Sequence, residues 1–443
     1  MRSTLSWSDL ARLRPRVGIF GLGREGLANL RACAERGIAP VLVDEGSAAV
    51  DGYEVLTGPA GAAALLECDV VVKTPGISRR TNPTVLRLAR AGIPVVGGLG
   101  LWLQDADRSR VLCVTGTKGK STTSAIAGHL LRGLGRRCLV GGNIGVPPWD
   151  PEVAADPVDA WVIEVSSYQA TDVASSPPVV AVTSLHPDHL PWHGGDTLDP
   201  DQYYRDKLSL CTQPGADLTV ANGDSDLLRA RRDLLGPRVE WVGAGDDPGA
   251  DWMEPLGLLG AHNRRNALIA RAALRALGVP AGEEELRRAA AGFRHLESRL
   301  TPVATVDGVT FVDDSLSTNV LPTLAAVEAF PDRRVALVVG GFSRGIDYAP
   351  LAVGLRGRTA PTLLLTVPGN GAHIGEVVRA TGAGPAVEVR DCSGLEEAVG
   401  AGFAWARPDG VVLLSPAAAS FDLYADYRAR SAAFAAAVKT VRT

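Results

Sequence analysis

The sequence predicts an α/β protein with three successive domains, each built on a mainly parallel sheet covered by helices. Short apolar runs alternate with helical stretches along most of the chain, which is the pattern of β-α-β units. With 443 residues, the chain is also long for one domain, so two or three are expected. The alternation restarts near residues 108 and 298, which gives domains 1–107, 108–297 and 298–443.

In the first domain, four apolar runs are predicted strands. They stand in "RVGIFGLGREG", "APVLVDEG", "CDVVVKTPGIS" and "IPVVGG". The strands of the second domain include those in "SRVLCVTG", "DAWVIEVSS", "VVAVTSL" and "DLTVAN", and helices rich in arginine and alanine follow over 263–292. The third domain has strands in "VTFVDDS", "RRVALVVGG", "PTLLLTV" and "GVVLLSP".

The composition excludes several classes of protein. A net charge of −4 and a pI near 6.0 give no basic field for holding nucleic acid. No apolar run reaches membrane-spanning length, and "MRSTLSWSDLARLRPR" lacks an apolar signal core. The six cysteines have no paired spacing and mostly lie in apolar contexts. We therefore expect buried free thiols in a cytoplasmic protein that neither enters a membrane nor binds nucleic acid.

The segment "GLGREG" follows the first predicted strand and carries Gly21, Gly23 and Gly26, and Asp44 ends the next strand. This arrangement places a pyrophosphate at a helix N-terminus and a ribose hydroxyl near a carboxylate. NAD is the ordinary inference, but another nucleotide diphosphate fits equally well. A tight turn without a ligand is the third possibility.

The segment "GTKGKS" (116–121) also follows a strand and should begin a helix. It is a shortened phosphate loop, because Val114 occupies the position of the first Walker glycine. Backbone N–H groups would hold the phosphates, Lys120 would neutralise their charge, and Ser121 would hold Mg²⁺. Only five of the 45 basic residues are lysines, and Lys118 and Lys120 are both in this loop. The loop predicts ATP binding.

Three further features have chemistry of their own. Glu164 ends an apolar strand, a position that suits a carboxylate directed at Mg²⁺. "SLHPDHLPWH" offers His186, His189 and His193, but no cysteine or HExxH helix supports zinc, and we expect only His189 to meet a second Mg²⁺. Lys207 lies on a predicted helix in "YYRDKLSL", where in isolation it would be a solvated lysine.

Together these motifs resemble the Mur ligases, ATP-dependent enzymes that add amino acids to the peptidoglycan precursor, and most of all their glutamate-adding branch. The resemblance covers essentially the whole chain and keeps the order of the motifs: GLGREG, TPGIS, GTKGKS, GGNIG, EVSSYQ, HPDH, RDK, GAHNRRN, SRL, DDS–STN and LSPAAASFD.

The resemblance implies a UDP-substrate site, an ATP site and two Mg²⁺ ions. It implies that the first domain binds UDP and not NAD. The residues implied at the UDP-substrate site are Gly23, Arg24, Glu25, Asp44, Gly76, Asn143, Ser166 and Gln169. Those implied at the ATP site are Gly116, Thr117, Lys118, Gly119, Lys120, Ser121, Thr122, Asn263, Asn266, Arg299 and Asp314. Those implied at the metals are Ser121, Glu164, His189 and Lys207.

The resemblance also implies a two-step reaction, with Lys120, His189, Lys207 and Arg299 as catalytic residues. ATP phosphorylates the carboxylate of UDP-N-acetylmuramoyl-L-alanine, and the amine of glutamate then displaces the phosphate. Lys207 matches a lysine that is carbamylated in the family. Its amine must first lose a proton, from a pKa of about 10.4 when unperturbed. A monomer is expected.

The chain departs from the usual D-glutamate ligases at four positions. Leu316 and Arg344 stand where lysines are usual, Ser298 replaces a histidine and Ser184 replaces an asparagine. Since arginine binds a carboxylate as a planar fork and lysine as a point charge, the geometry of the amino-acid site should differ. The departures resemble the variant that adds L-glutamate, for which a separate epimerase acts afterwards. The residues expected to bind glutamate are Thr318, Arg344, Ser420 and Tyr427.

Several alternatives stay open at this stage. The chain could still add D-glutamate, and Tyr427 could be a core aromatic on a helix face. A relative of folylpolyglutamate synthase would lack the separate domain that carries "GLGREG". A nicotinamide oxidoreductase would leave the phosphate loop and Lys207 unused, and a non-catalytic nucleotide-binding regulator would need the loop alone.

Overall fold

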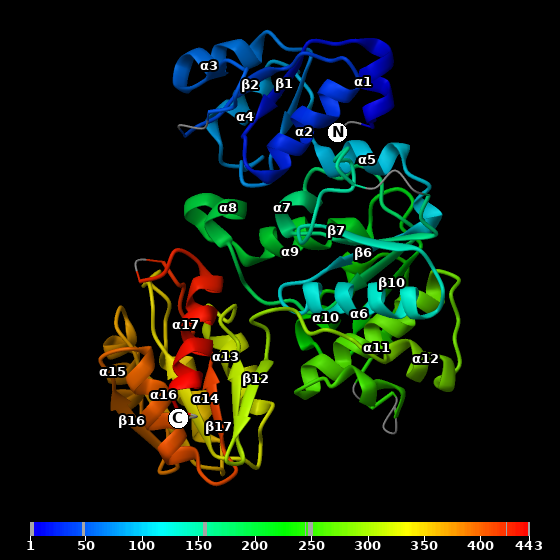
Figure 1. Ribbon diagram of the computed structural model, residues 1–443. Helices are drawn as coiled ribbons and strands as arrows, with labels where there is room; N and C mark the ends of the chain where they lie inside the picture. Colours follow the sequence, from blue (N-terminus) through cyan, green and yellow to red (C-terminus); the bar gives the residue numbers. More distant parts are fainter. Residues whose placement is uncertain are drawn as a thin grey trace. The chain divides into compact units, whose positions relative to one another are not determined.

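The computed structural model describes residues 4–46, 49–153, 157–243, 245–246, 251–421 and 423–441. The chain forms two compact units (Figure 1). The first consists of residues 1–257 and 264–293, and the second of residues 258–263 and 294–443. The predicted sequence of α/β elements is confirmed, with two sheets in the first unit and one in the second.

The first sheet has the order β3-β2-β1-β4-β5, and all its strands are parallel. Its strands are β1 (Val17–Phe20), β2 (Val41–Val43), β3 (Val55–Leu56), β4 (Val70–Lys73) and β5 (Val95–Gly97). The helices of this region are α1 (Trp7–Leu13), α2 (Arg24–Glu35), α3 (Gly58–Leu66), α4 (Pro83–Arg90) and α5 (Gly98–Asp105). The "GLGREG" turn leads from β1 into α2, as the sequence predicts.

The second sheet has the order β11-β10-β9-β6-β8-β7 and is also parallel throughout. Its strands are β6 (Val111–Thr115), β7 (Cys138–Gly142), β8 (Ala160–Glu164), β9 (Val179–Val182), β10 (Leu218–Asn222) and β11 (Arg238–Val242). The α-helices are α6 (Lys120–Gly133), α7 (Ser167–Ala170), α8 (Leu190–Gly194), α9 (Pro200–Leu208), α10 (Asp226–Ala230), α11 (Ala261–Ala276) and α12 (Glu283–Ala290). Its described residues also form five 3₁₀ helices: Arg108–Arg110, Gly195–Thr197, Ser209–Cys211, Arg232–Leu235 and Asp251–Leu256.

One apolar core runs through both sheets of the first unit. Trp102 of α5 meets Trp161 of β8 edge to face, with ring centroids 5.1 Å apart. Lys73 at the end of β4 is fully buried, and its ammonium lies 2.5 Å from a carboxylate oxygen of Asp172, which Arg79 also contacts. A buried lysine needs such a partner. The 1–107 region and the central sheet therefore form a single compact body in this chain.

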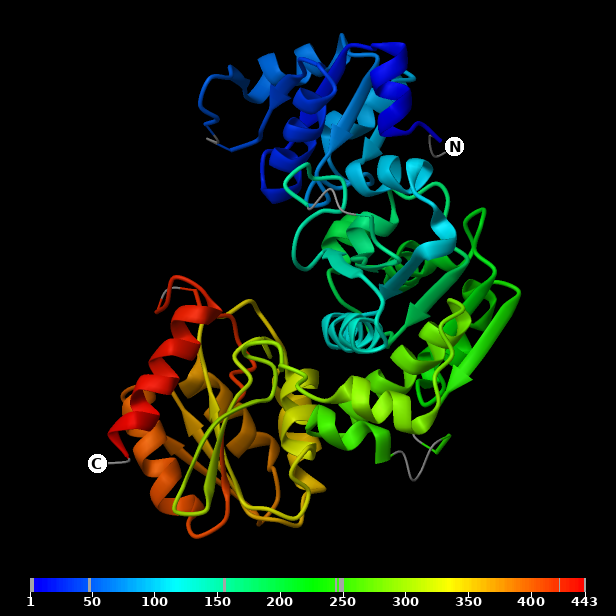
Figure 2. The same cartoon turned by 45° about the vertical axis from the view of Figure 1, so that its right-hand side comes forward.

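The sheet of the second unit has the order β12-β13-β17-β14-β15-β16, in which only β12 is antiparallel to its neighbour. Its strands are β12 (Thr301–Val306), β13 (Val309–Asp313), β14 (Val335–Val339), β15 (Thr362–Thr366), β16 (Val387–Asp391) and β17 (Val411–Leu414). Its helices are α13 (Val320–Glu328), α14 (Ala349–Arg356), α15 (Gly371–Thr381), α16 (Leu395–Ala406) and α17 (Tyr427–Thr440), which cover both faces (Figures 1 and 2).

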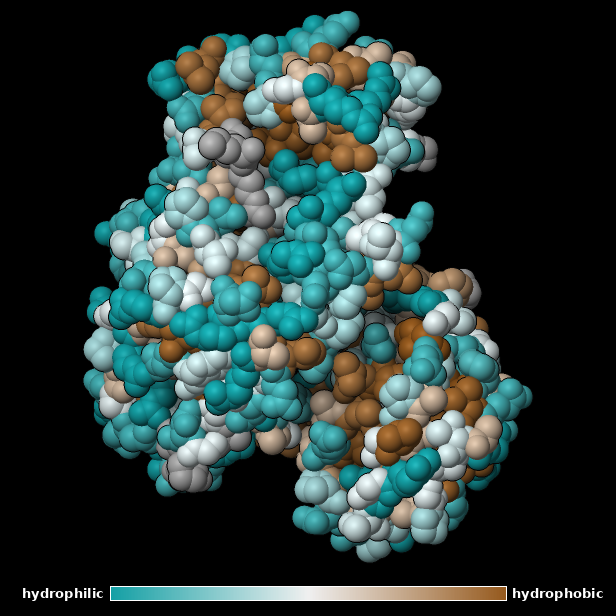
Figure 3. All heavy atoms as spheres, turned by 180° about the vertical axis from the view of Figure 1, so that it is seen from behind, coloured by the Kyte–Doolittle hydropathy of each residue, from teal (hydrophilic) through white to brown (hydrophobic). Residues whose placement is uncertain are grey.

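The central strand β14 shows why helices cover both faces of this sheet. Its alternate residues belong to two different apolar clusters, because successive side chains of a strand point to opposite faces. Figure 3 shows apolar side chains gathered on part of this unit's surface. Leu321 of α13 and Val353 of α14 are 46% and 55% exposed.

Two predictions from composition can be compared with the structure. All six cysteines are buried and free, as expected. Among the described residues, no helix combines the length and the apolar character needed to cross a membrane.

Candidate active site

The phosphate loop lies at the carboxyl edge of the central sheet, between β6 and α6. Gly116 and Gly119 have φ angles of +137° and +88°, which favour glycine. A Cβ on Gly116 would lie 2.2 Å from Thr183 Oγ1, so the loop also packs too closely for a side chain there. The helix begins at Lys120. The N–H groups of its first turn and its positive dipole end therefore face the loop, as phosphate binding requires.

Two lysine amines converge on one carbonyl of this loop. Lys120 Nζ donates to Gly116 O at 2.9 Å and to Thr117 O at 3.1 Å, and Lys207 Nζ donates to Gly116 O at 2.9 Å. Lys207 is 2% exposed. Burial and the neighbouring Lys120 ammonium lower the pKa of Lys207 well below its ordinary value. Lys207 is therefore not the solvated lysine that its local sequence suggests.

The second lysine of the loop has a different partner. Lys118 Nζ lies 3.2 Å from Asp188 Oδ2, and its backbone N–H donates to Ser184 Oγ at 2.9 Å. His189 follows Asp188 in a left-handed conformation, with φ of 52°. Burial and then the Lys118, Lys207 and Lys120 charges lower the pKa of His189, although Asp188 opposes them. A neutral imidazole can coordinate a metal ion through its unprotonated ring nitrogen.

A buried carboxylate oxygen points to a cation site beside the loop. Glu164 ends β8, and its Oε1 accepts a hydrogen bond from Asn143 Nδ2 at 2.6 Å. Within the described part of the chain its Oε2 is buried and has no hydrogen-bond partner. Ser121, in the first turn of α6, is 5% exposed. Glu164 and Ser121 supply hard oxygen donors, which suit Mg²⁺.

The described residues contain no preformed group of three or more histidine, cysteine or acidic side chains that could hold a metal ion. The predicted ligands Ser121, Glu164, His189 and Lys207 are instead chemically mixed. Such a set fits an ion that also takes ligands from a bound nucleotide, as Mg²⁺ does.

The residues predicted for the UDP substrate lie where the first sheet meets the central sheet. Arg24 Nη2 donates to Asn143 O at 2.8 Å, and Gln169 Nε2 donates to Glu25 Oε1 at 2.7 Å. Burial raises the pKa of Glu25 to about 7. Ser166 caps α7 and bonds Gln169 in a capping box. The structure thus brings these five residues together.

Three other predicted positions have local roles in shaping the turns. Asp44 accepts hydrogen bonds from the N–H groups of Leu22, at 2.7 Å, and Gly46, at 2.8 Å, so its carboxylate organises the glycine-rich turn. Gly23 precedes α2 as its N-cap. Gly76 O accepts from Trp192 Nε1 at 2.9 Å.

Of the remaining ATP-site predictions, Thr117, Thr122 and Asn266 lie in or beside the phosphate loop. Thr117 Oγ1 lies 2.9 Å from the Tyr203 hydroxyl. Thr122 lies in the first turn of α6. A Cβ on Gly119 would lie 2.6 Å from Asn266 Oδ1, so this amide covers the loop. Asn263 is also on α11, and its Nδ2 donates to Leu259 O at 2.9 Å.

The other predicted residues gather at one edge of the second unit's sheet. Arg299 precedes β12, and Asp314 and Thr318 follow β13. Asp314 Oδ2 accepts from Ser415 Oγ at 2.8 Å, and burial raises its pKa to about 7. Because β13, β17 and β14 are parallel neighbours, the loops after them meet at this edge.

Those loops carry the residues predicted for glutamate. Arg344 follows β14 and lies over the Phe421 ring at 6.0 Å from its centroid, and Phe342 meets the same ring at 6.4 Å. Ser420 is buried in the loop after β17. Tyr427 begins α17 and is half-buried, so its predicted role stays a prediction, as does the alternative of a core aromatic.

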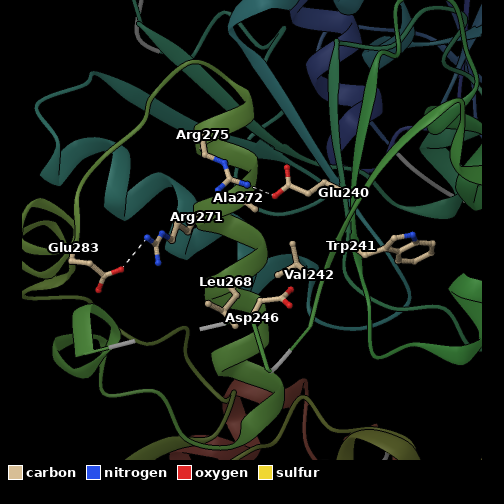
Figure 4. A pocket seen from close by; sticks show the side chains of 9 residues that line it. All are labelled: Glu240, Trp241, Val242, Asp246, Leu268, Arg271, Ala272, Arg275 and Glu283. Carbon is tan, nitrogen blue, oxygen red and sulfur yellow. Dashed lines mark hydrogen bonds and ion pairs between the residues drawn. The ribbon is translucent and has the colours of Figure 1, made fainter. Parts of the chain in front are cut away.

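A separate hollow of about 410 Å³ lies between β11 and α11 (Figure 4). Its arginines are already paired, Arg275 with Glu240 and Arg271 with Glu283 at 2.9 Å. The predicted site residues are not among those that line it. The predicted chemistry gathers elsewhere.

Sequence reasoning missed four charged or polar partners of the central site. Asp188 was quoted in "HPDH" without a role, His193 was treated as merely nearby, and Arg80 and Asp206 were not selected. His193 is in fact buried and bonded to Asp206 and Ser167. The available signal was an acid directly before Lys207 on a helix, where a buried carboxylate needs donors.

Comparisons with known proteins agree with this arrangement. The model of the Mur ligase middle domain matches residues 114–255. A Salinispora tropica protein is 40% identical, with 97% of this chain and 99% of that protein covered. A Micromonospora protein is 39% identical over 97% and 98% of the two chains, and a Xanthomonas euvesicatoria protein is 38% identical over 95% and 94%. All three are named UDP-N-acetylmuramoyl-L-alanine–L-glutamate ligase.

Solved structures give the same fold at low sequence identity. The UDP-N-acetylmuramate–alanine ligase MurC of Thermotoga maritima has a TM-score of 0.55 at 18% identity and covers 96% of this chain and 100% of its own. The MurF ligase of Thermotoga maritima, solved with ADP, has a TM-score of 0.58 at 16% identity, with 96% and 95% covered. The whole-chain identity to curated ligases decides the family: the chain belongs to the Mur ligases.

Proposed function

We propose that this chain is an ATP-dependent ligase that joins glutamate to UDP-N-acetylmuramoyl-L-alanine in peptidoglycan precursor synthesis. The observation that carries the proposal is the meeting of Lys120 and Lys207 on the Gly116 carbonyl, beside the buried oxygen of Glu164. Two lysine amines and a carboxylate that can bind a cation, all at a phosphate loop, suit phosphoryl transfer. The names of the relatives supply the substrates.

In this proposal ATP phosphorylates the carboxylate of the UDP substrate, and the glutamate amine displaces phosphate from the acyl phosphate. The loop N–H groups and Lys120 hold the phosphates in line with that carboxylate. Mg²⁺, held by Ser121, Glu164, His189 and Lys207 at two positions, would supply charge neutralisation when bound. Asn266 would contact the adenine side of ATP.

Lys207 would act as a carbamate in this reaction. The amine must be neutral to take up CO₂, and burial next to Lys120 lowers its pKa in that direction. The neutral amine adds CO₂ and releases a proton to solvent. The resulting carbamate anion is attracted to the neighbouring Lys120 ammonium and supplies an oxygen donor for a cation. The environment therefore favours carbamylation over a second buried positive charge.

The other predicted residues divide into two substrate-binding sets. Arg24, Glu25, Asn143, Ser166 and Gln169, together with Gly23, Asp44 and Gly76, would receive the UDP substrate. Arg299 and Asp314 would contact ATP, and Thr318, Arg344, Ser420 and Tyr427 would bind glutamate. We further propose a cytoplasmic monomer with three functional regions, 1–107, 108–297 and 298–443.

We propose L-glutamate as the amino acid. Two observations support this choice: the names of the relatives, and the presence of Arg344 and Leu316 where D-glutamate ligases usually carry lysines. A forked guanidinium beside Phe421 presents a different geometry from a flexible ammonium. If L-glutamate is added, a separate epimerase must invert the product later.

The test supplies purified protein with ATP, Mg²⁺ and UDP-N-acetylmuramoyl-L-alanine, and measures phosphate release with L- or D-glutamate in separate reactions. Mass spectrometry of the product verifies the amide. Turnover with L-glutamate alone is expected. Turnover with D-glutamate alone would overturn the stereochemical choice, and no turnover with either would overturn the proposed function.

A further inference from the structure

The residue before Lys207 is the centre of a buried hydrogen-bond network. Asp206 is 2% exposed and receives donors from three directions. Arg80 contacts both carboxylate oxygens as a fork, with Nε 2.8 Å from Oδ2, while Gln202 Nε2 lies 2.9 Å from Oδ1. His193 Nδ1 lies 2.9 Å from Oδ2. A buried carboxylate with this many partners has one defined position.

His193 extends the network to a third element. Its Nε2 lies 3.0 Å from Ser167 Oγ at the start of α7, and the imidazole is fully buried. Since the Asp206 carboxylate can only accept, Nδ1 of His193 donates to it. The clamp, by which we mean Arg80, His193 and Asp206, therefore joins α7, α8 and α9.

Arg80 belongs to the loop after β4 that also carries Gly76, and this loop is tied to α8 by two further bonds. Ser78 Oγ donates to Trp192 O at 2.8 Å, and Trp192 Nε1 donates to Gly76 O at 2.9 Å. Trp192 in turn stacks on Tyr168 with ring centroids 4.3 Å apart. The loop from the first sheet and the helices of the central region are thus held together by side chains.

The position of the Lys207 amine depends on where α9 lies. Asp206 and Lys207 are adjacent on this helix, so their side chains leave it in directions about 100° apart. A clamp on Asp206 therefore fixes both the rotation and the height of the helix at the point where the Lys207 side chain leaves it. The amine then reaches Gly116 O at 2.9 Å.

We propose that Arg80, His193 and Asp206 are positioning residues that hold Lys207 against the phosphate loop, and that Arg80 links this position to the Gly76 loop. The proposal rests on the proposed function, because it assigns Lys207 a carbamate to be positioned. The Gly76 loop, expected to meet the UDP substrate, and the site of phosphoryl transfer then form one preorganised body.

The test compares three variants of the full chain. Asp206→Asn keeps the shape but removes the charge that Arg80 and His193 face, and Arg80→Lys keeps the charge but loses the fork. Arg231→Ala is the matched control, because it breaks the Arg231–Asp201 pair at the partly exposed start of the same helix. Each variant is measured for kcat, for KM of ATP and of UDP-N-acetylmuramoyl-L-alanine, for melting temperature, and for the carbamate signal in ¹³C-bicarbonate by NMR.

For Asp206→Asn we expect kcat to fall by about 10- to 100-fold while KM for ATP changes by less than about threefold. The carbamate signal should fall with kcat, and added bicarbonate should restore part of both. Arg80→Lys should do the same and also raise KM for the UDP substrate. Arg231→Ala should match the wild type.

Wild-type kcat and carbamate signal in Asp206→Asn and Arg80→Lys would overturn the inference, and so would a lowered melting temperature alone. If the wild type shows no turnover, the proposed function fails, and the ¹³C signal still decides whether the clamp positions Lys207. If Asp206→Asn does not fold, Arg80→Lys gives the same decision.

Discussion

The two sheet edges that carry the predicted chemistry differ in how their charged groups are held. At the central sheet, Lys207 and Glu164 are 2% and 1% exposed, and hydrogen bonds fix Lys207 and one oxygen of Glu164. At the second unit's sheet, Arg344 is exposed on a loop and lies over Phe421, which is itself 52% exposed. Lys207 and one oxygen of Glu164 are thus buried and held in place, whereas Arg344 is open to solvent.

This difference suggests that the central edge carries out the chemical step and that the second edge selects the amino acid. Charges buried at fixed positions interact strongly and need no rearrangement during the reaction, which is what stabilises a transition state. An exposed guanidinium is weakened by solvent but can bind and release a small acid. We therefore expect substitutions at the central edge to lower kcat, and substitutions at the second edge to raise KM for glutamate.

Lys207→Ala tests the central edge most severely. Removing this buried amine should lower kcat by about 10²- to 10³-fold, because the loop loses one of two cooperating groups beside the transferred phosphoryl. Steady-state phosphate release measures the effect, and calorimetric ADP binding should persist through Lys120. Lys439 is exposed, so Lys439→Ala is the matched control and should leave kcat unchanged. Activity within a few-fold of wild type would break the contrast and favour a nucleotide-binding regulator.

Arg344→Ala tests the open edge. We expect KM for glutamate to rise by about 10- to 100-fold with a smaller change in kcat, since a charge-assisted contact to a carboxylate is lost. The KM for glutamate of Arg344→Lys should lie between those of the wild type and Arg344→Ala, because lysine keeps the charge but lacks the planar guanidinium. Arg379, which pairs with Asp391 at 2.9 Å, supplies the control as Arg379→Ala. An unchanged KM for glutamate would remove Arg344 from the pocket.

Asp314 is the buried charge of the second edge and gives the smallest expected effect. Burial raises its pKa to about 7, above the unfolded value, so its contribution to stability is present at low pH and lost as the pH rises through about 7. Between about pH 6 and 8, the wild type should lose about 1 kcal/mol of unfolding free energy relative to Asp314→Asn. Urea unfolding at the two pH values measures this.

Exposed Asp409→Asn is the control for that experiment and should follow the wild type. Parallel pH curves for the wild type and Asp314→Asn would show that Asp314 ionises normally, and the buried character of this carboxylate would then not affect stability.

The strands that the sequence analysis did not name have a physical feature in common. Within the described residues they are β3, β7, β11, β12 and β16, and each lies at the edge of its sheet. An edge strand is covered on fewer sides, so it needs no continuous apolar run. Strand β14, by contrast, is buried and apolar at every position. A continuous apolar run of this kind predicts a strand directly from the sequence.

The sequence by itself determined the order of strands, turns and helices and the location of the phosphate loop, Glu164 at a strand end and Lys207 on a helix. These features depend on glycine turns and hydrophobic periodicity, which act between residues a few positions apart. Only the tertiary structure decided that Lys207 is buried on Gly116 O, 91 residues away, and that Asp206 is clamped by Arg80, 126 residues away. The pKa of an amine and the position of a carboxylate depend on remote segments, and no local pattern records them.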